Sequence, residues 1–196
     1  MQLEKRALAS PPELRADGNA KVARGYAAMF NSETGLSFFR ERIMPGAFSA
    51  SLKDGDIRAL VDHDTGRVIG RSTAGTLRLN EDDKGLFVEI DLPDTTDGRD
   101  LAVSLERGDI SGMSFGFRVT HDEWDETVDP VLRTIHAVDL FEVSAVAFPA
   151  YGDTEIALRS FQASKEKPEA KRNAEMAERR IAERKAAAEQ KFRKIA

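Results

Sequence analysis

Residues 112–120 constrain the fold more than any other part of the chain. Apolar side chains recur there at every second position, with small or polar residues between them; the apolar residues are Met113, Phe115, Phe117 and Val119. Successive side chains of a β-strand point to opposite faces of the sheet, so a period of two predicts a strand with one buried face. An amphipathic helix would instead need a period near 3.6 residues.

Short segments of similar character recur through the chain and predict its class. They are rich in β-branched or aromatic residues, or alternate in polarity, and they cover residues 22–30, 57–62, 68–71, 76–79, 86–90 and 131–148. Two helices are predicted between them, one over 45–52 that begins at Pro45 and one over 97–107 that Gly108 would end. About seven short strands with two or three helices predict a mainly β protein with some helices, built as an antiparallel barrel or sandwich.

Composition divides the chain into three parts. Residues 1–19 read as a loose, flexible leader, residues 20–160 as the folded body, and residues 161–196 as a charged helical C-terminal extension. Residues 165–196 hold 11 basic and 6 acidic side chains, whereas the rest of the chain holds 18 basic and 28 acidic ones. The thin stripe of small apolar residues in the extension favours a solvated helix, with a helix that docks onto a partner as the alternative. The acidic body is a poor candidate for nucleic-acid binding, because phosphate contacts need clustered Lys and Arg.

Several chemistries are not expected from this sequence. It has no cysteine, which excludes disulfides, thiolate nucleophiles and cysteine-bound zinc and fits a reducing cytoplasm. Its three histidines, His63, His121 and His136, lack metal-ligand spacing, and no phosphate-binding or dinucleotide-binding glycine motif follows a strand. We therefore predict no metal and no cofactor. No apolar run approaches the roughly 18 residues of a membrane span, and the first residues lack the apolar middle of a signal peptide.

Ser114 is the first candidate for chemistry. Its neighbours on the same strand face are Gly112 and Gly116, so it lies on a strip without other side chains. Another backbone can approach such a strip closely, as an acyl-transfer nucleophile requires. The alternative is that the glycines mark a bulge or a sharp twist and that the serine has no chemical role.

His63 and Glu142 are the other two candidates. His63 is predicted to end a strand on the same face as Val61, so the flanking Asp62 and Asp64 would point away from its ring. It is either a general base or a hydrogen-bonded structural residue. Glu142 lies in an apolar strand segment, where burial demands a partner for its carboxylate: a histidine N–H or a buried arginine.

Taken together, these segments resemble the prohead proteases of tailed bacteriophages, capsid-maturation serine proteases related to the herpesvirus assemblins. The resemblance runs from about residue 22 to residue 151 and is carried by the stretches GYAAMFN, ERIMPGAFSASL, IRALVDHDTGRVIGRSTAGTLRL, GLFVEIDLPDT, RGDISGMSFGFRV and VDLFEVSAVAFPAY. It implies that residues 20–160 form a serine protease domain, an antiparallel β-barrel of about seven strands surrounded by helices.

The resemblance also implies roles for individual residues. His63 falls on the histidine of the family's first motif, and Ser114 falls on the serine of its Ser-Phe-Gly-Phe motif. Glu142 best matches the acid that phage members place third, while the second histidine of the herpesvirus relatives makes His136 the alternative. Ser111 is the alternative nucleophile.

The biology implied by the resemblance is capsid maturation. Family members act inside the immature capsid in the host cytoplasm, cut the scaffolding region of the major capsid protein, and often cut themselves. The partners expected here are therefore the major capsid protein with its scaffolding segment and the protein itself, through autoproteolysis or as a homodimer. The rival interpretation is a catalytically inactive protease-fold scaffold, or a binding module of capsid assembly.

Overall fold

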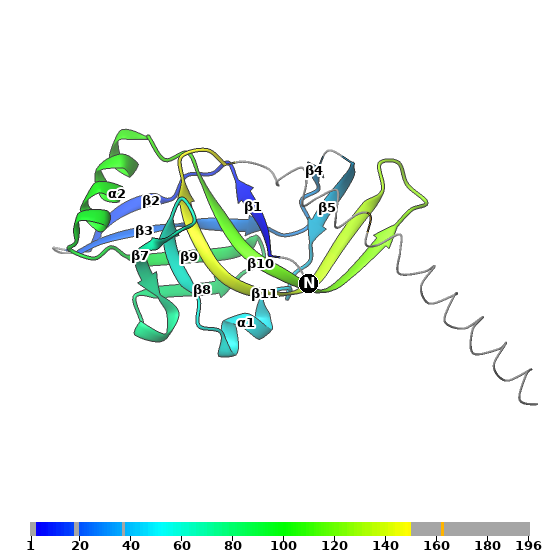
Figure 1. Ribbon diagram of the computed structural model, residues 1–196, viewed down its shortest axis with the longest axis horizontal. Helices are drawn as coiled ribbons and strands as arrows, with labels where there is room; N and C mark the ends of the chain where they lie inside the picture. The colour runs from blue at the N-terminus through cyan, green and yellow to red at the C-terminus, as the bar shows by residue number, and fades with distance from the viewer. Residues whose placement is uncertain (1–2, 18–19, 37, 150–161, 163–196) are drawn as a thin grey trace, which may run out of the picture. The chain divides into compact units, whose positions relative to one another are not determined.

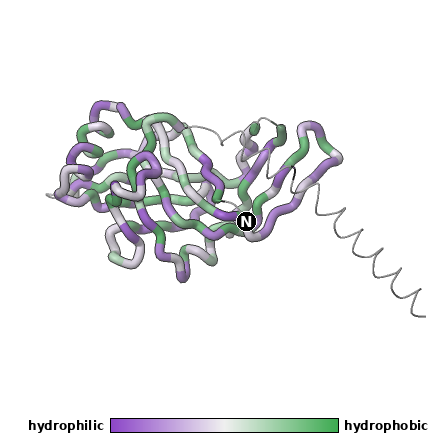
Figure 2. Tube along the Cα trace, viewed as in Figure 1, coloured by the Kyte–Doolittle hydropathy of each residue, from purple (hydrophilic) through white to green (hydrophobic). Residues whose placement is uncertain are grey.

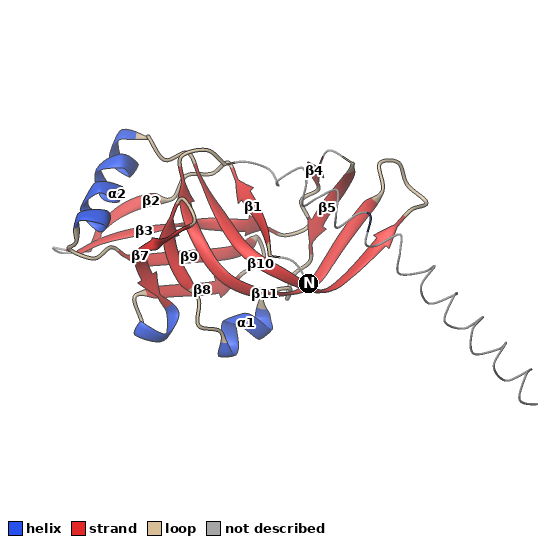
Figure 3. Cartoon of the chain, in the orientation of Figure 1, coloured by secondary structure: helices blue, strands red, loops and turns tan. Residues whose placement is uncertain are grey.

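The computed structural model describes residues 3–17, 20–36, 38–149 and 162, and they confirm the mainly β class with few helices (Figure 3). The elements in chain order (Figure 1) are β1 Glu4–Leu8, β2 Glu13–Asp17, β3 Ala20–Met29, β4 Thr34–Leu36, β5 Phe39–Ile43, α1 Ser49–Asp54, β6 Arg58–Val61, β7 Asp64–Arg71, the 3-10 helix η1 Ser72–Ala74, β8 Leu77–Glu81, β9 Gly85–Asp91, α2 Thr96–Arg107, β10 Gly112–Asp125 and β11 Leu132–Val146. The chain separates into two units, residues 1–157 and 158–196. The predicted helical extension lies outside the described residues, apart from position 162.

Two open sheets make up the described fold. One has the strand order β1-β10-β11-β5-β4, with β6 paired to β11 and β7 to β6, and the other has the order β2-β3-β9-β8. Most pairs are antiparallel, but β5 and β6 pair in parallel with the two ends of β11. The closed antiparallel barrel predicted from the resemblance is therefore wrong for the described residues. The sheets there end at edge strands, and the long β11 pairs with β5 along one half and with β6 along the other.

The apolar face predicted for residues 112–120 forms the centre of the core. Met113, Phe115 and Phe117 are each at most 2% exposed, and the Phe115 ring stacks on Phe117 and meets the Phe48 ring edge-on. The opposing side chains come from the second sheet, including the fully buried Val88. By contrast, the tip of the β10–β11 hairpin is hydrophilic (Figure 2). The part of β11 that follows this tip pairs with β5.

The two predicted helices are found with different accuracy. Helix α2 matches its prediction: the Thr95 side chain accepts a hydrogen bond from Gly98 N at its start, and Gly108 ends it with φ 78°. Helix α1 begins four residues later than predicted, because Gly46 adopts φ 88° and residues 45–48 form a turn. None of the helices in the described ranges is long and apolar enough to span a membrane.

The prediction of a loose leader over residues 1–19 is wrong for most of that segment. Strand β1 pairs antiparallel with β10, and β2 pairs antiparallel with β3. The leader therefore contributes one strand to each sheet. Its pairing partners lie as far away as β10, more than 100 residues along the chain, so no local pattern reports them.

Candidate active site

The structure brings Glu142 and His63 into contact. Glu142 Oε1 lies 2.7 Å from His63 Nδ1, and Glu142 Oε2 accepts a hydrogen bond of 2.6 Å from the Ser144 hydroxyl. The side chains of His63 and Glu142 are 17% and 13% exposed. Both carboxylate oxygens are thus held, and the partner of the predicted buried acid is a histidine rather than an arginine.

His63 lies in a tight turn instead of at the end of a strand, which corrects the prediction. Asp62 and His63 are the two residues between β6 and β7, and their φ values are 51° and 60°. Two positive φ angles are typical of a two-residue hairpin turn that favours Asn-Gly. Aspartate is accepted at the first position of such a turn, whereas histidine in place of glycine at the second costs about 1 kcal/mol or more.

Strand β11 holds this turn in place. Ala145 O accepts a hydrogen bond from Asp62 N, Asp62 Oδ1 accepts one from Ala147 N, and the Ser144 hydroxyl accepts one from His63 N at 3.2 Å. The ring of His63 has its described polar contact with Glu142 and not with the flanking aspartates. The expectation that these aspartates do not orient the imidazole is therefore confirmed.

Ser114 lies on the same face of the sheet as this pair. In the β10–β11 ladder Ser114 is opposite Ser144, and Gly116 is opposite Glu142. Residues directly opposite each other point to the same face, so the serine, the carboxylate and the histidine bound to it share one side of the sheet. However, Ser114 is only 2% exposed, and its hydroxyl donates a 2.7 Å hydrogen bond to Arg6 O rather than one to His63.

The bare strip around Ser114 is filled by close neighbours. A Cβ atom on Gly116 would collide with Glu142 Oε1, and one on Gly112 would collide with Leu8 O and the ring of Pro149. At Gly112 the strip therefore admits the backbone of β1, whereas at Gly116 the Glu142 side chain fills it. The bulge interpretation also holds in part, because the β10–β11 register shifts between Gly116 and Phe117.

The alternative site residues are not brought to His63. The described side-chain contacts of His136 are with Glu123 at 3.4 Å and with the ring of His121 at 5.1 Å between centroids. The hydroxyl of Ser111 donates to Ala147 O. No three His, Cys, Asp or Glu side chains gather as a metal site would require within the described part of the chain.

Ser144 is a member of the site that sequence reasoning missed. It is fully buried and contacts both Glu142 Oε2 and His63 N. The spacing of Glu142 and Ser144 by two residues in a strand places both side chains on one face, which is the signal that could have found it.

A serine, a histidine and a carboxylate on one face of a mainly β protein are the parts that serine hydrolases use for acyl transfer. The sequence model of the caudovirus prohead serine protease family matches residues 10–168, so the chain belongs to this family. This confirms the resemblance that the sequence motifs indicate.

Individual relatives agree with this assignment. The chain is 32% identical to the prohead protease of Enterobacteria phage HK97 over 139 residues, which cover 68% of this chain and 58% of the relative. It is 32% identical to the prohead protease of Escherichia phage T5 over 95 residues, which cover 48% and 42%. It thus spans about half the length of these relatives. Its fold is similar to that of the bacteriophage T4 capsid assembly protease, with a TM-score of 0.52, 13% identity and coverage of 74% of this chain and 97% of that one.

Proposed function

We propose that this protein is a serine endopeptidase of virion assembly that cleaves the scaffolding region of the major capsid protein, and itself, during prohead maturation. It would act inside the immature capsid in the host cytoplasm. The observation that carries the proposal is the contact of Glu142 with His63 Nδ1 on the sheet face that also holds Ser114.

The contact supports a separate role for each nitrogen of the imidazole. A proton on Nδ1 directed at Glu142 leaves Nε2 free to accept the hydroxyl proton of Ser114. Ser114 Oγ then attacks the scissile carbonyl and forms an ester, the C–N bond breaks, and the imidazolium returns the proton to the leaving amine. Water hydrolyses the ester by the same route. Glu142 stabilises the imidazolium in both halves of the reaction.

The second candidate function is a catalytically inactive scaffold or binding module of capsid assembly. One observation favours it: the hydroxyl of Ser114 is covered and is bonded to Arg6 O. Catalysis would require this hydroxyl to turn from Arg6 O to His63. Ser114 and the Glu142–His63 pair, which would act after that movement, nevertheless share one face of the sheet.

Co-expression with the major capsid protein of the same phage tests the proposal. We expect the capsid protein to lose its scaffolding segment, with a single new terminus that mass spectrometry of the intact protein identifies. Capsid protein that stays at full length, beside a folded copy of this chain, would favour the inactive scaffold. If the active form is a homodimer, as the resemblance to the herpesvirus enzymes allows, the cleavage rate per molecule should rise with protein concentration.

Gly116→Ala is expected to lower the cleavage rate by roughly 100-fold. The added methyl group collides with Glu142 Oε1 and so displaces the carboxylate from His63. The matched control is Gly35→Ala in strand β4, where a Cβ atom meets nothing within 4 Å, and this variant should cleave at the parent rate. Equal rates for the two variants would contradict a positioning role for Glu142.

A further inference from the structure

Strand β1 lies along the edge of β10 and covers Ser114. Ala7 is opposite Ser114 in the ladder, and the carbonyl of Arg6 accepts the Ser114 hydrogen bond at 2.7 Å. Gly112 lets Leu8 O approach closely. An extended segment of the chain therefore occupies the strip beside the serine, which is the place where an extended substrate would have to lie.

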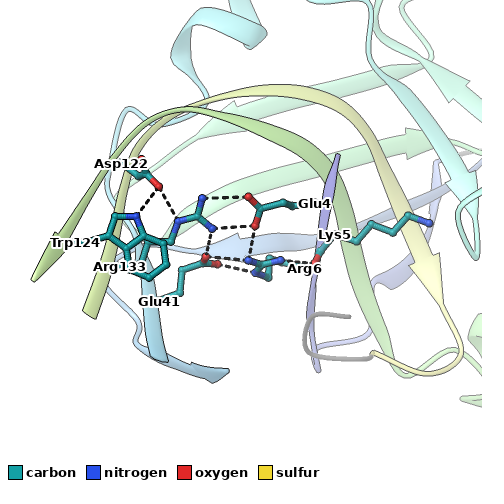
Figure 4. Close-up of polar contacts among 7 residues, drawn as sticks. All are labelled: Glu4, Lys5, Arg6, Glu41, Asp122, Trp124 and Arg133. Atoms are coloured by element: carbon teal, nitrogen blue, oxygen red, sulfur yellow. Dashed lines mark hydrogen bonds and ion pairs between the residues drawn. The ribbon is translucent and has the colours of Figure 1, made fainter. Parts of the chain in front are cut away.

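A buried charge cluster holds this strand (Figure 4). Arg6 donates to both oxygens of Glu41 in β5, at 2.7 and 2.9 Å. Arg133 in β11 donates to both oxygens of Glu4, at 2.9 and 3.1 Å, and also to Glu41 at 3.0 Å. All four side chains are less than 10% exposed. On the far side, Asp122 accepts a hydrogen bond from Arg133 Nε at 3.0 Å.

The charged residues that β1 contributes are complementary, in charge and in spacing, to those that the rest of the fold contributes. The body supplies one acid, Glu41, and one base, Arg133, while β1 supplies Arg6 and Glu4 two residues apart on one strand face. Burial alone would raise the pKa of Glu4, but the hydrogen bonds and charges of Arg133 and Arg6 lower it below its ordinary value. Glu4 is thus ionised at neutral pH. A strand with a different charge pattern would take from Glu41 its two hydrogen bonds to Arg6, or from Arg133 its two hydrogen bonds to Glu4.

A purely structural edge strand has no need of such a cluster. Buried ion pairs add little net stability compared with apolar side chains of similar size, whereas they discriminate strongly against wrong partners. Recognition by strand addition works in this way: the backbone ladder supplies binding, and alternate side chains supply specificity.

We propose that the edge of β10, together with Glu41 and Arg133, is the docking site for substrate segments that carry a glutamate and an arginine two residues apart. Residues 4–8 are the built-in occupant of this site, and a substrate segment displaces them. The identification of the displacing segment as a substrate rests on the proposed function. The docking site itself rests on the contacts above.

Peptide binding to the full chain tests the docking site without cleavage as a readout. Arg6→Ala removes the arginine from β1, so a fluorescent peptide with the sequence of residues 2–10 should bind this variant. The control peptide has glutamate in place of that arginine. We expect fluorescence anisotropy to show about tenfold tighter binding of the native peptide than of the control peptide. The parent chain should bind both weakly, because its own β1 competes at a high effective concentration.

Two further variants make the result decisive. Adding Glu41→Gln to Arg6→Ala should remove most of the preference between the peptides, whereas Arg15→Ala alone, at an exposed position of β2, should behave like the parent. If Arg6→Ala does not fold, as judged by thermal unfolding, Arg6→Lys replaces it, since lysine keeps the charge and loses the paired hydrogen bonds. A folded variant that binds both peptides equally, or neither, overturns the docking site.

The outcomes separate this inference from the proposed function. Selective peptide binding without any cleavage of capsid protein would support the docking site and contradict the protease. Cleavage of capsid protein by a chain whose Arg6→Ala variant has no peptide preference would support the protease and contradict the docking site.

Discussion

Ser114→Ala is expected to stop cleavage of co-expressed capsid protein, lowering the rate by roughly 1000-fold or more. The reason is that alanine has no oxygen to form the ester intermediate, and the Ser144 hydroxyl on the same face is already bonded to Glu142 and to His63 N. The intact mass of the capsid protein after co-expression measures the effect. His63→Asn should cause a similar loss, and it is preferable to alanine because asparagine tolerates the positive φ of the turn.

The controls distinguish lost chemistry from lost folding. Ser111→Ala should cleave at the parent rate, because the Ser111 hydroxyl contacts a backbone carbonyl and not the imidazole. Ser114→Ala should unfold within about 1 kcal/mol of the parent, since it loses one hydrogen bond to Arg6 O. Combining Ser114→Ala with His63→Asn should add little to either loss, because the two residues act as a unit. Normal cleavage by the folded Ser114→Ala protein would rule out this serine as the nucleophile.

Local sequence patterns predicted the elements whose form depends mainly on neighbouring residues in the chain. The period-two pattern around Phe115 predicted β10 and its buried face, and the cap residues around helix α2 predicted its ends. The motif match then placed His63, Ser114 and Glu142, which the structure finds on one face. The catalytic roles of these three residues stay a prediction.

What the sequence could not predict depends on contacts between distant segments. Strand β1 is held by Glu41 and Arg133, which lie 35 or more residues away, so its five residues look like an unstructured leader in isolation. The turn at His63 was missed because Asp62 is followed by His63 and not by the glycine that such turns favour at the second position. The prediction of a closed barrel was wrong for the described residues. Strand β11 pairs in parallel with β5 at one end and with β6 at the other, and no local pattern reveals this pairing.

Arg133→Met is expected to destabilise the folded unit by about 3–5 kcal/mol. Methionine fills a similar volume, but it leaves the buried carboxylates of Glu4 and Glu41 with Arg6 as the cation bonded to both. It also removes an ion pair from the half-buried Asp122. The Arg133 guanidinium also lies over the Trp124 ring at 5.2 Å, a contact that methionine replaces only in part. The predicted loss corresponds to a fall in Tm of roughly 10 °C, which calorimetry or urea unfolding would measure.

Arg78→Met is the matched control for this prediction. Arg78 also makes two hydrogen bonds to one carboxylate, that of Asp91, at 2.6 and 2.8 Å, but it lies on the surface with 47% of its side chain exposed. Water and salt screen such a pair, so its loss should cost no more than about 1 kcal/mol. The difference between the two variants therefore measures what the buried cluster adds to a paired contact with a single carboxylate. If both arginines prove equally dispensable, the buried cluster does not hold β1 against the sheet, and another interaction must explain why Ser114 is covered.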